Sequence, residues 1–153
     1  MRVIVLTLCE HATVSSVGLV SMLNGGVNRI GRPIFPAPLG LTLVAMIELP
    51  IDYVSGSEIA IEITITSPDE DEVFGRVEGG VASQIRPGAD LRAATAAIVV
   101  DISPIAVTKV GLYKVNVRFP GTEEPGSSIY FEVDTGIAPV EVGVEPTPPH
   151  DSP

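Results

Sequence analysis

Apolar and polar residues alternate with a period of two along several short segments of this chain. In Glu58–Thr66 an isoleucine occupies every second position, and Glu, Ala or Thr occupies the positions between. Successive side chains of a strand point to opposite faces, so this segment is predicted to be a strand with one face on a core and the other in water. Tyr113–Phe119 repeats the pattern, with Lys, Asn and Arg between its apolar residues. Half-buried strands of this kind are typical of antiparallel sheets.

Val, Ile and Thr dominate the other apolar segments, which Gly, Pro, Asn and Asp separate. Such residues favour strands joined by turns, and helix signals are almost absent. The segments predicted to be strands are Arg2–Cys9, Gly18–Leu23, Leu41–Leu49, Glu58–Thr66, Val73–Gly80, Ala96–Ile102, Leu112–Phe119 and Ile129–Val133. About eight strands suffice for two packed sheets, so the predicted fold is an all-β, two-sheet antiparallel sandwich of the immunoglobulin-like or C2-like kind.

Turn residues separate these strands. Ser67–Glu72 is predicted to be the tip of a hairpin, and Pro120–Pro125 to be the turn between the last two strands. Asn24–Pro38 holds too many glycines and prolines for a regular element, so we expect a loop there. The alanines of Asp90–Ala97 favour a helix by propensity, but the β-branched residues that follow favour a loop leading into a strand.

The chain length of 153 residues predicts a single domain, because it is too short for two independent cores. Hydrophobic residues make up 45% and charged residues only 18%. This composition is typical of a folded domain, because disordered chains combine low hydrophobicity with high charge. We expect residues 1–138 to form the sandwich domain. Residues 139–153 are rich in proline and acid, so they are expected to be a mobile tail that cannot bury enough surface to offset its ordering entropy.

The net charge of -10 repels phosphate backbones and anionic lipid surfaces, so neither a nucleic acid nor a membrane is an expected partner. The single cysteine, Cys9, can close no internal disulfide, which fits a reducing compartment. The apolar run Val3–Cys9 is short and meets Glu10 where a signal peptide would have its cleavage site. We therefore expect no cleavable secretion signal and a cytoplasmic protein, or a virion protein if the gene belongs to a bacteriophage.

Several segments together resemble a known bacterial family. They are the opening strand with Cys-Glu-His-Ala at 9–12, the segment 18–26, the segment 41–50 after the proline loop, and the closing segments 111–117 and 129–133. They resemble the family called domain of unknown function 6941, over roughly residues 2–134. The resemblance implies a compact sandwich of bacterial or bacteriophage origin. It implies no activity, because the family has no assigned catalytic residues to carry over.

Cys9, Glu10 and His11 form the only cluster of chemically capable side chains in the sequence. A thiolate beside an imidazole is a recognisable nucleophile arrangement. Cys9 and His11 share a face only if the strand continues to residue 11, and Glu10 then lies on the opposite face and cannot orient the imidazole. We therefore interpret Cys9 as a buried small residue and His11 as the end of a strand, and we assign no catalytic residue.

Acidic residues at Asp69–Glu72 suggest a calcium site, since Ca²⁺ takes six to eight oxygen ligands. Further oxygens would have to come from neighbouring loops, for which Asp90, Glu123 and Glu124 are the candidates. Consecutive carboxylates at one tip rarely converge, so a solvated hairpin tip is the favoured interpretation. No metal ligand and no cofactor is assigned.

Gly25-Gly26 followed by Asn28-Arg29 suggests a phosphate cradle, but neither a Walker pattern nor a helix start follows. Turn glycines explain the pair. His150 lies in the C-terminal tail and is expected to be solvated.

The function hypothesis that follows is a non-enzymatic structural or protein-binding module. Its apolar content is high for a small domain, which favours self-association or a place as accessory subunit in a larger assembly. A capsid or tail component of a bacteriophage is one form of this hypothesis. The alternative is a ligand- or metal-binding sandwich in which the 24–38 loop and the acidic 69–72 tip flank a pocket.

Overall fold

The computed structural model describes residues 1–16, 18–50, 58–67, 72–82 and 93–136. Its strands are β1 (Arg2–Cys9), β2 (His11–Val14), β3 (Val20–Leu23), β4 (Arg29–Gly31), β5 (Ala37–Pro38), β6 (Thr42–Pro50), β7 (Glu58–Thr66), β8 (Val73–Ala82), β9 (Ala93–Asp101), β10 (Ala106–Val107), β11 (Gly111–Arg118) and β12 (Ser127–Asp134). The described ranges contain no helix, which confirms the all-β class. Accordingly, none of them holds a helix long and apolar enough to span a membrane.

All eight predicted strands are present, with ends displaced by three residues at most. The prediction that 24–38 lacks regular structure is wrong, because β4 and β5 lie within it. Each is short and depends on distant partners: β4 pairs with β12, and β5 pairs with β10. The helix alternative for 90–97 is also wrong from Ala93 onward, where β9 begins, while 90–92 lie outside the described residues.

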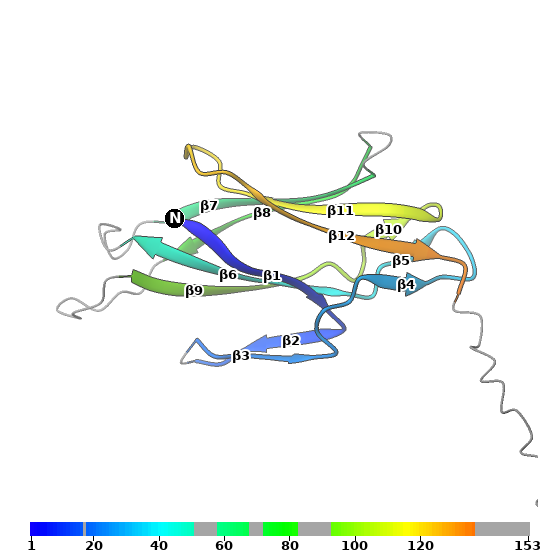
Figure 1. The fold of residues 1–153 in the computed structure, drawn as a ribbon, viewed down its shortest axis with the longest axis horizontal. Helices are drawn as coiled ribbons and strands as arrows, with labels where there is room; N and C mark the ends of the chain where they lie inside the picture. The colour runs from blue at the N-terminus through cyan, green and yellow to red at the C-terminus, as the bar shows by residue number, and fades with distance from the viewer. Residues whose placement is uncertain (17, 51–57, 68–71, 83–92, 137–153) are drawn as a thin grey trace, which may run out of the picture.

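Two larger sheets form two layers (Figure 1). The three-stranded sheet has the order β1-β6-β9 and is antiparallel. The five-stranded sheet has the order β4-β12-β11-β7-β8 and is antiparallel except where β4 runs parallel to β12. Two further two-stranded sheets, β10-β5 and β2-β3, complete the described part, in which no sheet closes on itself.

Hairpin connections link neighbouring strands of the five-stranded sheet. β7 and β8 pair antiparallel, which confirms a hairpin around Ser67–Glu72, although 68–71 lie outside the described residues. β11 and β12 also pair antiparallel, which confirms the turn at Pro120–Pro125. The predicted tail, 139–153, lies outside the described residues.

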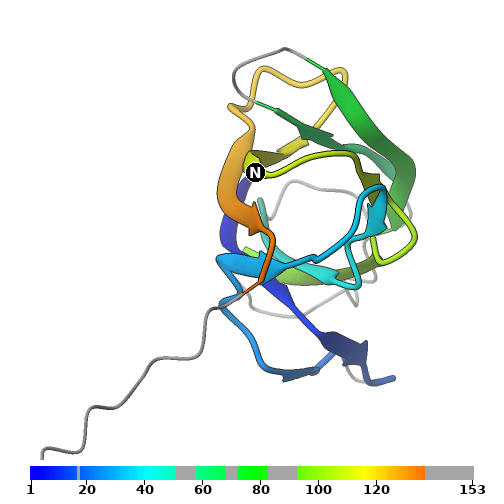
Figure 2. The same ribbon diagram turned by 90° about the vertical axis from the view of Figure 1, so that its right-hand side faces the viewer.

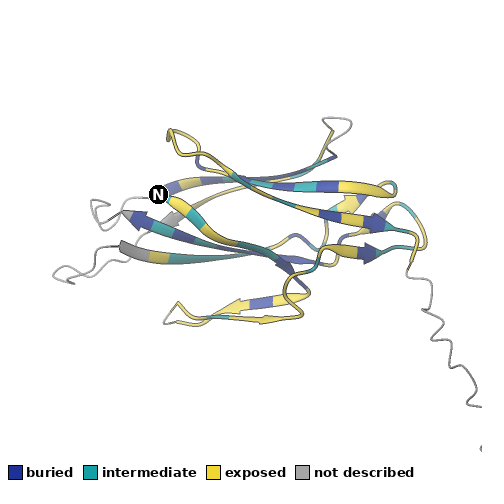
Figure 3. Cartoon of the chain, in the orientation of Figure 1, coloured by how far each residue is buried: buried dark blue, intermediate teal, exposed yellow. Residues whose placement is uncertain are grey.

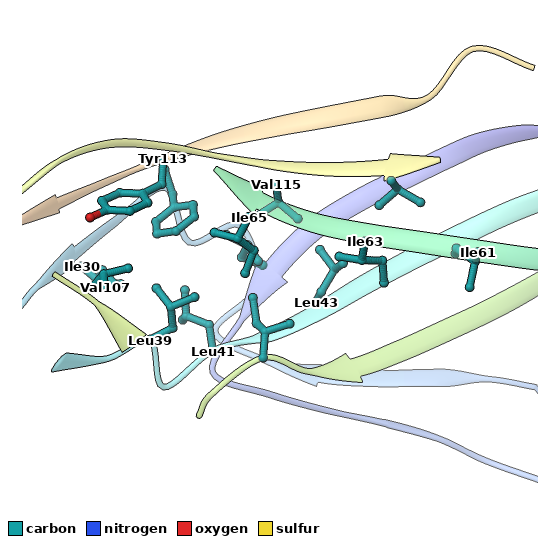
Figure 4. Close-up of a cluster of buried hydrophobic side chains, with 14 of the residues drawn as sticks. Ile30, Leu39, Leu41, Leu43, Ile61, Ile63, Ile65, Val107, Tyr113 and Val115 are labelled. Carbon is teal, nitrogen blue, oxygen red and sulfur yellow. The ribbon is translucent and has the colours of Figure 1, made fainter. Parts of the chain in front are cut away.

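The core lies between the two larger sheets. The four isoleucines of β7 are buried, each with 6% or less of its surface exposed, as their alternation predicts. Leu43, Ile47 and Leu49 of β6 belong to the same cluster from the other sheet. Figure 4 shows the Ile63 side chain of β7 beside Leu43. The period-two pattern therefore specifies which face of each sheet is inside and which two faces lie outside.

Candidate functional site

A bend in the chain at Glu10 places Cys9 and His11 in different strands. β1 ends at Cys9 and β2 begins at His11, so the two residues belong to different sheets. The Cys9 thiol is fully buried and donates to the Thr42 carbonyl at 3.5 Å. The Glu10 carboxylate accepts a hydrogen bond from the Asn24 side-chain amide at 2.7 Å, and His11 is exposed. A nucleophile, its base and an orienting acid are therefore not assembled here.

Cys9 is expected to resist thiol reagents in the native protein. Burial raises the pKa of its thiol, and a backbone hydrogen bond involving His11 opposes that shift only in part. Because the thiolate is the reactive form and access requires local opening, labelling is expected to be slower by about two orders of magnitude or more than in the unfolded chain. Labelling kinetics with a chromogenic disulfide, with and without denaturant, measure this. Equal rates in the two conditions would refute the buried position.

The acidic candidates for a calcium site are not brought together in the described part of the chain. Asp69–Asp71 and Asp90 lie outside it, and Glu72 is exposed. Glu123 and Glu124 follow Arg118, which pairs with Glu62 in the middle of β7. Because β11 is antiparallel to β7, the chain after Arg118 moves away from Thr66, the end of β7 that leads into the acidic hairpin tip. Figure 1 shows that turn and the Thr66 end of β7 at opposite ends of the molecule.

The Gly25-Gly26 segment is a turn whose amides are already used. Asn24 and Gly26 have positive φ angles of 50° and 84°. The Gly26 amide donates to the Leu8 carbonyl at 2.9 Å and the Val27 amide to the same carbonyl at 3.0 Å. These N–H groups point into the fold, so they form no cradle for a phosphate.

Arg29, the cationic candidate beside this turn, is held in an ion pair with Asp134 at 2.5 Å. A hydrogen bond from the Gly136 amide and then the Arg29 guanidinium hold the pKa of Asp134 below its usual value. Glu132 lies 3.7 Å from the same guanidinium. The three side chains join β4 to β12, which is a structural role.

One depression in the described residues lies away from the 24–38 loop, and the 69–71 part of the predicted pocket lies outside the described residues. A depression of about 290 Å³ lies at the β11–β12 turn; it is lined by Glu62, Arg118, Phe119, Pro120, Gly121, Thr122, Glu124 and Gly126. None of these residues belongs to the 24–38 loop or to the hairpin tip. The described residues also contain no group of three His, Cys, Asp or Glu side chains placed to hold a metal ion.

The outer face of the five-stranded sheet is charged. Arg76 of β8 forms ion pairs with Glu62 of β7 and, at 2.8 Å, with Glu78. The Lys114 ammonium lies 5.9 Å from the centre of the Tyr130 ring. Leu112 and Tyr130 are also exposed on this face, but each lies directly opposite a charged residue, so apolar and charged side chains are interspersed there.

The outer face of the three-stranded sheet is apolar. Val5, Met46 and Ala97 lie directly opposite one another in β1, β6 and β9, and form one row across all three strands. Val5 is 37% exposed and Ile4 beside it is 43% exposed. Arg2 and Glu48 form an ion pair at one end of this face, and Asp101 of β9 is exposed at the other end. The outer faces of the two larger sheets therefore differ in how many charged side chains they carry.

The β2-β3 hairpin covers part of this apolar face. Ala12 of β2 packs with Cys9 and Val44 in a second small cluster, to which Val20 and Val99 contribute. Figures 1 and 2 show the hairpin as a separate layer on the outside of the three-stranded sheet. Figure 3 shows that most of the hairpin is exposed, and four large apolar side chains are among its exposed residues. These are Val14, Leu19, Met22 and Leu23.

We call this region the outer apolar surface, defined by Ile4, Val5, Met46 and Ala97 of the sheet and by Val14, Leu19 and Met22 of the hairpin. Five of these are among the eleven large hydrophobic residues found exposed in the described chain, and all five fall within residues 4–22. Sequence reasoning anticipated an apolar excess but did not locate it. The signal lay in Val3–Leu6 and Leu43–Ile47, whose unbroken apolar runs indicate strands covered on both faces.

Comparison with known proteins places the chain in one family. No curated protein and no solved structure matches it. A family model matches residues 4–133, which include nearly all of the strands described above and most of the chain. The chain therefore belongs to the family of unknown function DUF6941.

Proposed function

We propose that this chain is a non-enzymatic structural module that associates with a second copy of itself through the outer apolar surface. The observation that carries the proposal is the contrast between the two outer faces. One carries the ion pairs of Arg76 with Glu62 of β7 and with Glu78 of β8, and the other has an uncharged row at Val5, Met46 and Ala97. Contiguous exposed apolar patches on soluble domains mark interaction sites.

A second copy is the occupant that this surface suits best. An interface with two-fold symmetry brings the same patch of both subunits together. The patch must therefore be able to pack against the same residues of the second subunit without placing like charges in contact. The row at Val5, Met46 and Ala97 buries no charge when it meets its image. The Arg2–Glu48 ion pair at one end of the face, with a contact of 2.5 Å, is neutral as a unit. An uncharged row adds no local repulsion at the contact between two chains that each carry a net charge of -10.

We further propose that the two larger sheets form an aligned sandwich of the immunoglobulin-like or C2-like kind, that the protein is cytoplasmic, and that it serves as a subunit of a larger assembly. A bacteriophage particle is one such assembly. Capsid or tail genes beside its gene would support that form, and a purely metabolic gene neighbourhood would remove it.

A charge placed in the apolar row is expected to disrupt association. Val5→Glu buries a carboxylate at the proposed contact, so the dissociation constant is expected to rise at least about tenfold. Leu112→Glu is the matched control, because Leu112 is 48% exposed on the charged outer face and its variant is expected to associate as the wild type does. Multi-angle light scattering over a concentration series measures the mass. Circular dichroism melts establish that both variants fold. A wild-type chain that stays monomeric at high micromolar concentration would overturn the proposal.

A further inference from the structure

β9 forms one edge of the three-stranded sheet. It pairs with β6 along its whole length, from Ala93 to Asp101, without a register shift. Within the described ranges no other strand pairs with its second edge. A strand edge of nine residues presents a row of backbone donors and acceptors that act as a template for another strand.

The pairing pattern identifies which backbone groups face outward. The Ile102 amide donates to the Leu41 carbonyl at 3.1 Å, in register with the β6–β9 ladder. Hydrogen-bonded pairs alternate in an antiparallel ladder, so Val100, Ile98 and Ala96 also direct their amides to β6. The amides and carbonyls of Thr95, Ala97 and Val99 are consequently directed to the open edge.

The composition of β9 leaves this edge unprotected. From Ala93 to Val100 it contains no charged residue and no proline. β8, the corresponding edge of the five-stranded sheet, carries Arg76 and Glu78 and has a register irregularity near its start. Charges and bulges are the usual means by which proteins prevent edge pairing. The protein therefore blocks pairing at one edge and leaves the other suited to it.

We infer that β9 pairs antiparallel with β9 of a second copy, about a two-fold axis at Ala97, to make a continuous six-stranded sheet. The choice of a second copy rests on the proposed function. Antiparallel pairing about this axis places Thr95 opposite Val99 and Ala97 opposite itself, so outward amides meet outward carbonyls. The small Ala97 side chains leave room at the axis. Asp101 falls opposite Ala93, which keeps the two carboxylates roughly 27 Å apart, at about 3.4 Å per residue.

Edge pairing extends the outer apolar surface rather than covering it. Ala97 belongs to the row with Met46 and Val5, so the axis joins this row to the same row of the second copy. The two contacts are therefore geometrically independent. Edge pairing makes a dimer with one wide apolar face, and that face then packs against another such dimer. The assembly implied by both contacts is a tetramer with two kinds of two-fold axis.

Amide hydrogen exchange tests the edge contact directly. The amides of Thr95, Ala97 and Val99 are expected to exchange at least about tenfold more slowly in the assembled protein than in dilute solution. Those of Ala96, Ile98 and Val100 are bonded to β6 within one chain, so they serve as internal controls whose protection does not depend on concentration. Residue-resolved exchange by nuclear magnetic resonance at two concentrations gives this comparison.

Substitution at Thr95 provides a second test. Thr95→Pro removes one outward amide at a position where the side chain is exposed, and proline is tolerated at a strand edge. The variant is expected to lose half of the assembly mass, whereas Thr95→Ala, which keeps the amide, is expected to retain it. If Thr95→Pro fails to fold, the exchange comparison on the wild type decides alone, and protection at Thr95, Ala97 and Val99 that does not depend on concentration overturns the edge contact.

The outcomes separate the two proposals. An alternating exchange pattern with loss of mass in Thr95→Pro supports the edge contact. A wild-type assembly that Val5→Glu dissociates, with no concentration dependence at Thr95, Ala97 or Val99, overturns the edge contact and leaves the proposed function standing. A monomeric wild type overturns both.

Discussion

Replacing Phe131 with alanine is expected to lower the free energy of unfolding by about 3–5 kcal/mol. Phe131 is 1% exposed and lies opposite Tyr113 in the β11–β12 ladder, with ring centres 5.6 Å apart. Phe74 meets the other side of Tyr113 edge-on at 5.0 Å. Truncation leaves a cavity against two aromatic rings that cannot collapse into it. The total free energy of unfolding of a domain of this size is about 5–15 kcal/mol, so this loss is a large share of it.

The neighbouring residue supplies a matched control for Phe131→Ala. Tyr130 is also aromatic but points to the outer face and is 51% exposed. Tyr130→Ala removes its contact with Lys114 and is expected to cost only about 0.5–1 kcal/mol. Urea unfolding followed by circular dichroism gives both values. Similar losses for the two variants would mean that the assignment of inner and outer faces on β12 is incorrect.

The long strands could be predicted from sequence because each carries its own pattern. β7 was predicted with its true ends, since alternating isoleucines specify both the strand and its buried face. β2 was missed because the reversal at Glu10 has neither glycine nor proline to mark it. β10 has two residues and exists only through its pairing with β5. Elements that depend on distant partners leave no local pattern, so sequence reasoning does not find them.

The candidate surface could be predicted only in part, for a related reason. Apolar excess is visible in the composition, and unbroken apolar runs are visible in β1 and β6. The row at Val5, Met46 and Ala97 exists only because β6 lies between β1 and β9, and strand order is a property of the whole fold. Cys9 and His11 were predicted to share a face only if one strand continues to residue 11. The bend at Glu10 ends β1 at Cys9, so that condition is not met, and Cys9 is buried as expected.

Replacing Arg32, whose side chain supports the shape of the segment 24–38, is the second change with a large expected effect. The Arg32 guanidinium donates to the carbonyls of Gly31 at 2.8 Å, Pro38 at 2.9 Å and Leu39, and ties β4 to β5. Arg32→Met keeps the aliphatic stem but removes every donor, so the free energy of unfolding is expected to fall by about 2–4 kcal/mol. Arg2→Met, which removes an exposed ion pair with Glu48, is the control and is expected to cost about 0–1 kcal/mol. Urea midpoints compare them, and equal losses would show that the guanidinium does not hold the segment.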